Sequence, residues 1–136
     1  MVNNLSRSKE NELIMMSLYT CLTRVSIGDE FSVEETLEGV FEMPYEDIPV
    51  FSKEIIIKSL SHINEIIPVF QEHMPKWKFS RLNKVAQAIL LMSYTNYKLV
   101  GDIDKVVVIN TAVKLAKLYL DNDEYKFINA ILDNVL

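Results

Sequence analysis

Residues 102–120 read DIDKVVVINTAVKLAKLYL, and this stretch decides between a helical and a β fold. Its run of β-branched residues at 106–109 is typical of a strand when taken alone. Apolar residues nevertheless recur at helical spacing through the whole stretch. They are Val106, Ile109, Val113, Ala116 and Leu120. We therefore expect one helix, opened by Asp102 or Asp104, with these five residues on its inward face.

The same helical spacing of apolar residues extends toward the N-terminus. One helix is expected around Leu13–Leu22, and a second begins at Ser32, where Ser32 and Glu35 have the spacing of a capping box. Pro44 closes that second helix, and a third is expected at residues 47–61. Pro68 is expected in the first turn of a short helix, where its missing N–H costs nothing.

Two further helices complete the prediction. Ser80 is a plausible cap for a long helix that runs through Tyr97 and ends at Gly101. Asp121 or Asp123 caps the last helix. The 136 residues contain only three glycines and four prolines, far fewer than turn-rich β proteins need. The sequence therefore predicts one all-α domain of six or seven helices, with no cofactor and no metal.

Composition also narrows the function. The formal net charge of −5 argues against indiscriminate nucleic-acid binding, and residues 25–60 alone hold nine acids and two bases. The longest uncharged run, residues 85–97, is too short and too polar for a membrane span. With no signal-peptide pattern either, we expect a cytoplasmic protein. His62 and His73 lack metal-ligand spacing, and Cys21 is expected to be a buried hydrophobe, so no enzyme is predicted.

A binding function has more support. Bases and aromatic residues alternate at residues 76–81, which read KWKFSR, and Lys126 precedes Phe127 in the last helix. Such combinations hold single-stranded RNA, because cations neutralise phosphates while aromatic rings stack on unpaired bases. Each of Trp77, Phe79 and Phe127 would more often be a core residue, so the pattern alone is weak.

Several motifs, taken together and in order, resemble those of the NusB transcription-antitermination family. They are SLY at 17–19, WKFSRL at 77–82, VINTAVKLAK at 108–117 and FINAILD at 127–133. The resemblance implies an all-helical fold of two packed helical subdomains, roughly 1–75 and 76–136. It also implies a non-enzymatic factor that binds boxA RNA with the ribosomal protein NusE inside a transcription elongation complex.

The resemblance implies an RNA surface as well. Its members are Arg7, Lys9, Tyr19, Ser80, Arg81, Asp123 and Phe127, to which Lys126 is added on charge grounds. The arginine-rich stretch usual at the family's N-terminus is thinned here, with Ser8 and Asn11 at two of its places. Asn110 and Asn129 match the family motifs, and we expect both to be buried amides that join helices.

Three other functions stay open at this point. The chain could be a protein-only module that kept the NusB fold and lost RNA recognition, its acidic block steering it toward a basic ribosomal protein. It could act mainly in rRNA transcription or ribosome assembly. A detached RNA-binding domain of an rRNA methyltransferase fits less well, because no catalytic domain or cofactor loop follows the last helix. Some members of the family pair as homodimers, which the sequence neither favours nor excludes.

Overall fold

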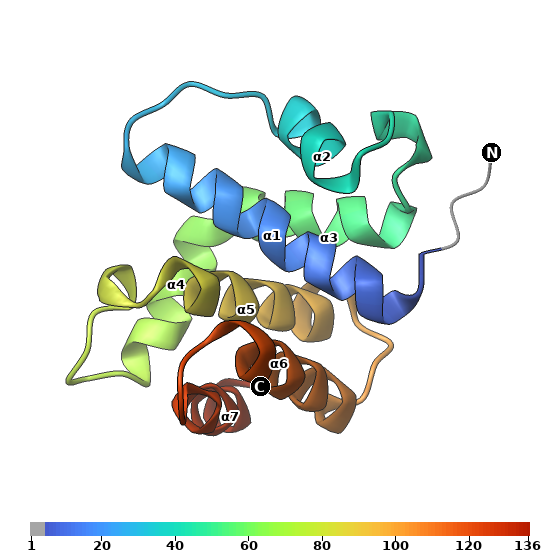
Figure 1. Cartoon of the computed structure of the whole chain (residues 1–136). Coiled ribbons are helices and arrows are strands. Elements are labelled where there is room, and N and C mark those ends of the chain that lie inside the picture. Colours follow the sequence, from blue (N-terminus) through green and yellow to red (C-terminus); the bar gives the residue numbers. More distant parts are fainter. Residues whose placement is uncertain (1–4) are drawn as a thin grey trace.

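The computed structural model describes residues 5–136, and these fold into helices joined by short connections (Figure 1). No strand occurs among the described residues, so the all-α prediction is confirmed. The seven α-helices are α1 Arg7–Ser26, α2 Val33–Phe41, α3 Val50–Ser61, α4 Ile63–Glu72, α5 Lys84–Tyr94, α6 Lys105–Tyr119 and α7 Glu124–Val135. Two 3-10 turns, η1 Tyr45–Asp47 and η2 Phe79–Arg81, and a π-helical segment, η3 Thr95–Val100, lie between them.

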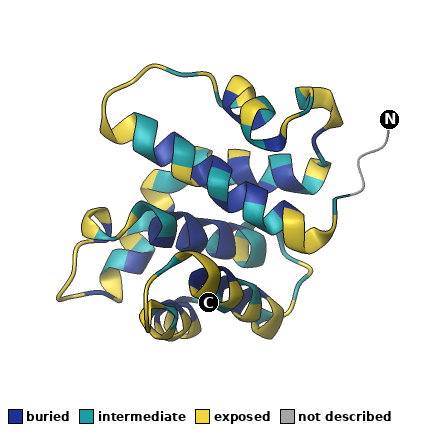
Figure 2. Ribbon diagram, in the orientation of Figure 1, coloured by how far each residue is buried: buried dark blue, intermediate teal, exposed yellow. Residues whose placement is uncertain are grey.

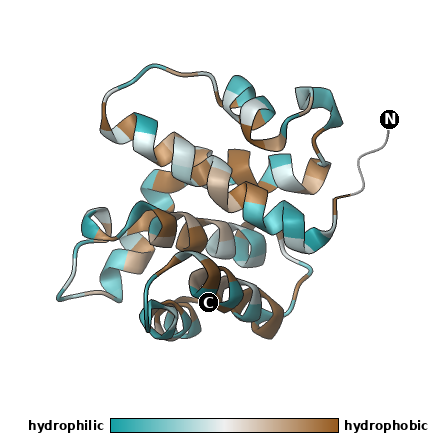
Figure 3. Cartoon of the chain, viewed as in Figure 1, coloured by the Kyte–Doolittle hydropathy of each residue, from teal (hydrophilic) through white to brown (hydrophobic). Residues whose placement is uncertain are grey.

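The long helix α1 is central to the packing. It contacts α2 and α3 on one side and α5 on the other, while α6 and α7 pack on each other below α5 in the view of Figure 1. Figure 2 shows that the buried residues of α1, α3 and α5 face one another. The hydrophobic residues gather on the same inward faces (Figure 3). One continuous apolar core therefore joins helices from both ends of the chain.

Two predicted helix ends are confirmed. The Ser32 hydroxyl accepts a hydrogen bond from the amide of Glu35 at 3.2 Å, which caps α2. Gly101 ends η3 with a φ of 82°, a conformation that glycine adopts without a Cβ penalty, and its amide donates to the Asn96 carbonyl at 2.9 Å. The predicted third helix begins three residues late, because residues 45–47 form η1 instead.

Ser80 does not cap α5. It lies inside η2, while the side chain of Asn83 accepts from the amide of Val85 at 2.7 Å and caps the helix. The buried ring of Phe79 fixes the chain at η2, so the helix cannot begin until after Leu82. An exposed serine next to a buried aromatic residue therefore misled the prediction.

Pro68 also departs from its predicted place, because it is the sixth residue of α4 rather than part of the first turn. There it removes the bond to the Asn64 carbonyl, at a cost of about 3 kcal/mol. Ile66 and Phe70, one on each side of it in sequence, are fully buried. Their burial, worth roughly 1.5–3 kcal/mol each, offsets the loss and keeps the segment helical.

The predicted inward face of α6 is partly wrong. Ile109 and Ala116 are buried, but Val106 is 67% exposed, and Val113 and Leu120 are only half-buried. The buried face instead includes Val108, Ala112 and Leu115, because α6 packs between α5 and α7. Asn110 and Asn129 are both exposed, so the expectation of buried amides is wrong for each.

Candidate nucleic-acid interface

The loop between α4 and α5 presents an aromatic side chain to solvent. Trp77 is 67% exposed, the most exposed aromatic residue of the described chain, which overturns its expected place in the core. Phe79, two residues later, is buried as expected and packs on the ring of Phe70. Since a surface tryptophan leaves a large apolar area in water, this residue marks a candidate contact surface.

Trp77 links two predicted site residues. It lines one hollow with Arg81, Lys76 and Lys78. It lines a second hollow with Phe127, whose ring is half-buried at the start of α7. Arg81 and Phe127, which are 46 positions apart in the sequence, therefore border one continuous surface. We call this surface, lined by Lys76, Trp77, Lys78, Arg81 and Phe127, the Trp77 surface.

The cations of the Trp77 surface are free of ion pairs. Among the described residues, none of Lys76, Lys78 and Arg81 lies within salt-bridge distance of a carboxylate. In contrast, Lys126 Nζ lies 3.5 Å from Asp123 Oδ2. The unpaired cations can accept a phosphate without first giving up a partner.

Arg7 lies elsewhere and is already engaged. Its guanidinium stacks over the Phe51 ring at 3.7 Å, and its Nε lies 3.5 Å from Glu10 Oε2. Glu10 is only 7% exposed and accepts from the Ser52 hydroxyl at 2.9 Å. These contacts tie α1 to α3, which gives Arg7 a structural role that the sequence did not reveal.

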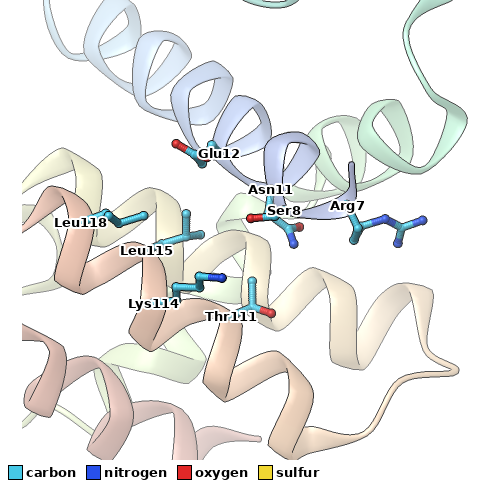
Figure 4. Close-up of a pocket in the computed structure, with 8 residues that line it drawn as sticks. All are labelled: Arg7, Ser8, Asn11, Glu12, Thr111, Lys114, Leu115 and Leu118. Carbon is cyan, nitrogen blue, oxygen red and sulfur yellow. The ribbon is translucent and has the colours of Figure 1, made fainter. Parts of the chain in front are cut away.

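A groove between α1 and α6 begins beside Arg7. Ser8, Asn11 and Glu12 line it from α1, while Thr111, Lys114, Leu115 and Leu118 line it from α6 (Figure 4). Farther along, the Tyr119 hydroxyl donates to the Glu12 carboxylate, and this bond raises the pKa of Tyr119. The groove carries both signs of charge, so it lacks the uniform cationic character of the Trp77 surface.

The remaining predicted residues are all exposed. Lys9 lies in the first turn of α1, Tyr19 is 41% exposed farther along that helix, and Ser80 lies in η2. Asp123 occupies the position before α7, but its side chain makes no capping bond. Figure 1 shows α1 and α5 antiparallel, so Arg7 and η2 lie toward opposite ends of that helix pair. The structure therefore brings Arg81 and Phe127 together and leaves Arg7 apart.

Other types of site find little support in the described residues. Cys21 is fully buried, and burial raises the pKa of its thiol to about 11. No three His, Cys, Asp or Glu side chains within residues 5–136 gather closely enough to hold a metal ion. Across the same residues, no helix is both long and apolar enough to cross a membrane.

The described residues form a small all-helical protein, and the Trp77 surface is its candidate contact surface. Comparison with known proteins makes this specific, because the family model of the NusB family matches residues 8–136. The chain belongs to the NusB family of transcription antitermination proteins.

Individual relatives agree with this assignment. The transcription antitermination protein NusB of Macrococcus caseolyticus is 36% identical over 79% of this chain and 80% of its own. The NusB of Thermodesulfovibrio yellowstonii is 30% identical over 96% of this chain and 91% of its own. Among solved structures, T. maritima NusB has the same fold, with a TM-score of 0.83 over 99% of this chain and 92% of that chain, at 21% identity. A chain in the crystal structure of a plectonemic RNA supercoil matches with a TM-score of 0.79 over 96% and 94%, also at 21% identity.

Proposed function

We propose that this protein is a non-enzymatic, cytoplasmic factor that binds boxA-type single-stranded RNA together with the ribosomal protein NusE. In this role it would act within a transcription elongation complex, as expected from its family membership. The RNA would contact the residues predicted from the sequence: Arg7, Lys9, Tyr19, Ser80, Arg81, Asp123, Lys126 and Phe127.

One observation carries the proposal, namely that Arg81 and Phe127 border a single surface whose cations are unpaired. A cation that neutralises phosphate and an aromatic ring that stacks on a base are the two groups that single-stranded RNA requires. Their convergence from η2 and from the first turns of α7 supports RNA binding over a structural role for both segments.

The three cations of the Trp77 surface predict how binding at this surface depends on salt. If Lys76, Lys78 and Arg81 reach phosphates, the logarithm of the affinity should fall with the logarithm of the salt concentration at a slope of about −2. The test is a titration of boxA-type RNA across a salt series, with and without NusE. No binding at low salt in either condition would refute the proposal.

A protein-only module of the same fold is the second candidate, favoured by the acidic surface of α2 and η1. Glu34, Glu42 and Glu46 are exposed there, and Arg7 is already held by Glu10. Such a surface would attract a basic ribosomal protein. Capture of NusE that RNA neither strengthens nor requires, combined with no RNA binding, would select this candidate.

A further inference from the structure

The loop before α5 is anchored in the core on both sides of Trp77, whose own side chain faces solvent. Met74 is buried on its N-terminal side and Phe79 on its C-terminal side, so both ends of the loop are anchored in the core. The Trp77 amide donates to the Met74 carbonyl at 3.2 Å, which closes a tight turn between the two anchors. Trp77 lies at the end of that turn with its side chain in solvent.

A single side chain from α4 fixes this turn. The Nε2 atom of Gln71 donates to the Met74 carbonyl at 3.0 Å and to the Trp77 carbonyl at 2.6 Å. Its Oε1 accepts from the Phe79 amide at 2.9 Å. Gln71 thus uses its donor and acceptor groups on the backbone before, at and after the tryptophan. A backbone held at three points loses little entropy when a ligand binds, so the loop that presents the ring is preorganised.

The lysine and arginine side chains around Trp77 have no acidic neighbour in the hollows that it lines. The three hollows that it lines contain Lys76, Lys78 and Arg81, and no Asp or Glu. Glu72 is the only acid in residues 66–101, and it lines none of these hollows. In a chain of net charge −5, this is a local reversal of sign around an exposed indole ring.

We propose that Trp77 is a stacking platform for one unpaired base of single-stranded RNA, and that Gln71 is the positioning residue that holds the platform. The free cations beside it would neutralise the flanking phosphates, since a base can stack only if its backbone comes close. This inference rests on the proposed RNA-binding function and names the residue that would contact a base. A basic protein partner fits this surface poorly, because its charge would be repelled.

Trp77 is the only tryptophan of the chain, so its fluorescence tests the proposal directly. Adding boxA-type RNA to the full chain should quench the emission, and the quenching should saturate together with binding measured by a shift assay. Trp77→Ala should weaken RNA binding by about 5- to 150-fold, the range expected for one stacked base. Trp77→Phe is the matched control and should retain most of the affinity. Both variants should melt as the wild type does, because the side chain is largely exposed.

Gln71 is tested by replacing it with leucine, which keeps the size of the side chain and removes its three hydrogen bonds. The fluorescence anisotropy of Trp77 should fall and RNA affinity should drop, because the ring is no longer held. Gln71→Glu keeps the acceptor for Phe79 but sets a carboxylate oxygen against the Met74 and Trp77 carbonyls, so it should lower the anisotropy as well. Unchanged anisotropy in Gln71→Leu would overturn its positioning role.

The outcomes separate this inference from the function on which it rests. If wild-type protein binds RNA and Trp77→Ala binds equally well, the stacking proposal is wrong and the proposed function stands. If Trp77→Ala weakens NusE capture but not RNA binding, the platform is a protein contact and the stacking proposal is wrong. If the wild-type chain binds no RNA at low salt with NusE present, the proposed function fails, and the stacking proposal fails with it.

Discussion

At the scale of single residues, Asp123 places a negative charge directly before α7, close to the predicted RNA contacts Lys126 and Phe127. Its carboxylate makes no bond to a helix amide and lies 3.5 Å from Lys126 Nζ. Asp123→Asn should therefore change the free energy of unfolding by less than about 0.5 kcal/mol, since exposed ion pairs contribute little. RNA affinity should rise a few-fold, because the substitution frees Lys126 and removes a charge that repels phosphate.

The same helix offers a matched control for this variant. Asp133 Oδ1 lies 3.5 Å from Lys105 Nζ, near the opposite end of α7 and away from Phe127. Asp133→Asn should leave RNA affinity unchanged in the same titration. Weaker binding by Asp123→Asn, with normal thermal stability, would show instead that the Asp123 carboxylate accepts hydrogen bonds from a base.

Cys21 predicts a pH dependence of stability. Its pKa in the folded chain is raised from 9.0 to about 11 by burial, so only the unfolded chain releases the proton between these values. The stabilisation is fully present below pH 9 and is lost as the pH rises toward 11, by about 2–3 kcal/mol. Urea unfolding at rising pH should show the wild type losing more stability than Cys21→Ala. Parallel curves for the two proteins would contradict the prediction.

For single residues, burial could be predicted from the sequence more easily than contacts with residues on other elements. The sequence identified the buried Cys21 and Phe79 correctly, because cysteine and phenylalanine are among the residue types most often buried. It could not show that Trp77 is exposed, since the loop that carries it is held by hydrogen bonds from Gln71, six positions away, and these form only in the folded chain. Nor could it show that Arg7 is held by Phe51, on another helix. Such contacts between distant residues arise only when the helices pack.

At the scale of elements, α4 contains a proline that lowers the stability of the helix and that can be replaced. Pro68 lies inside the helix with its ring side exposed to solvent, and it leaves the Asn64 carbonyl without the usual helical donor. Pro68→Ala restores that donor. The free energy of unfolding should rise by about 2–2.5 kcal/mol, after subtraction of the entropy that alanine returns to the unfolded chain.

Denaturant unfolding measures this change, and Pro44→Ala is its control. Pro44 lies outside the α-helices, before η1, so its replacement gains no helical bond. It should lower stability by about 0.4–1 kcal/mol through the unfolded state alone. A Pro68→Ala variant that is no more stable than the wild type would mean that the Asn64 carbonyl is satisfied in another way.

The helices themselves could be predicted well, but their ends and faces less so. Each predicted helix exists, because the apolar period is repeated over many residues. The error at Ser80 arose because Asn83, three residues later, is an equally good cap, and only the burial of Phe79 decides between them. The buried face of α6 shifted for a similar reason, since its two sides pack on α5 and α7 while Val106 remains exposed.

At the scale of the whole molecule, the two predicted subdomains, 1–75 and 76–136, share one core. The Phe70 ring of α4 lies 5.8 Å from that of Phe79 and 6.0 Å from that of Tyr94, measured between centroids. Helix α1 of the first part packs along α5 of the second. Because these contacts are buried, neither part can unfold without exposing the apolar surface of the other.

We therefore expect the chain to unfold as one cooperative unit, and Pro68→Ala provides the test. The stabilisation begins in α4, yet it should appear equally in the amides of α6, which lies in the other subdomain. Native-state hydrogen exchange measures both, since amides that open only by global unfolding report the full free energy. Protection in α4 and α6 should rise together by the amount seen in denaturant. A gain confined to α4, with α6 unchanged, would show that the two subdomains are separate folding units and that their shared core contributes little coupling.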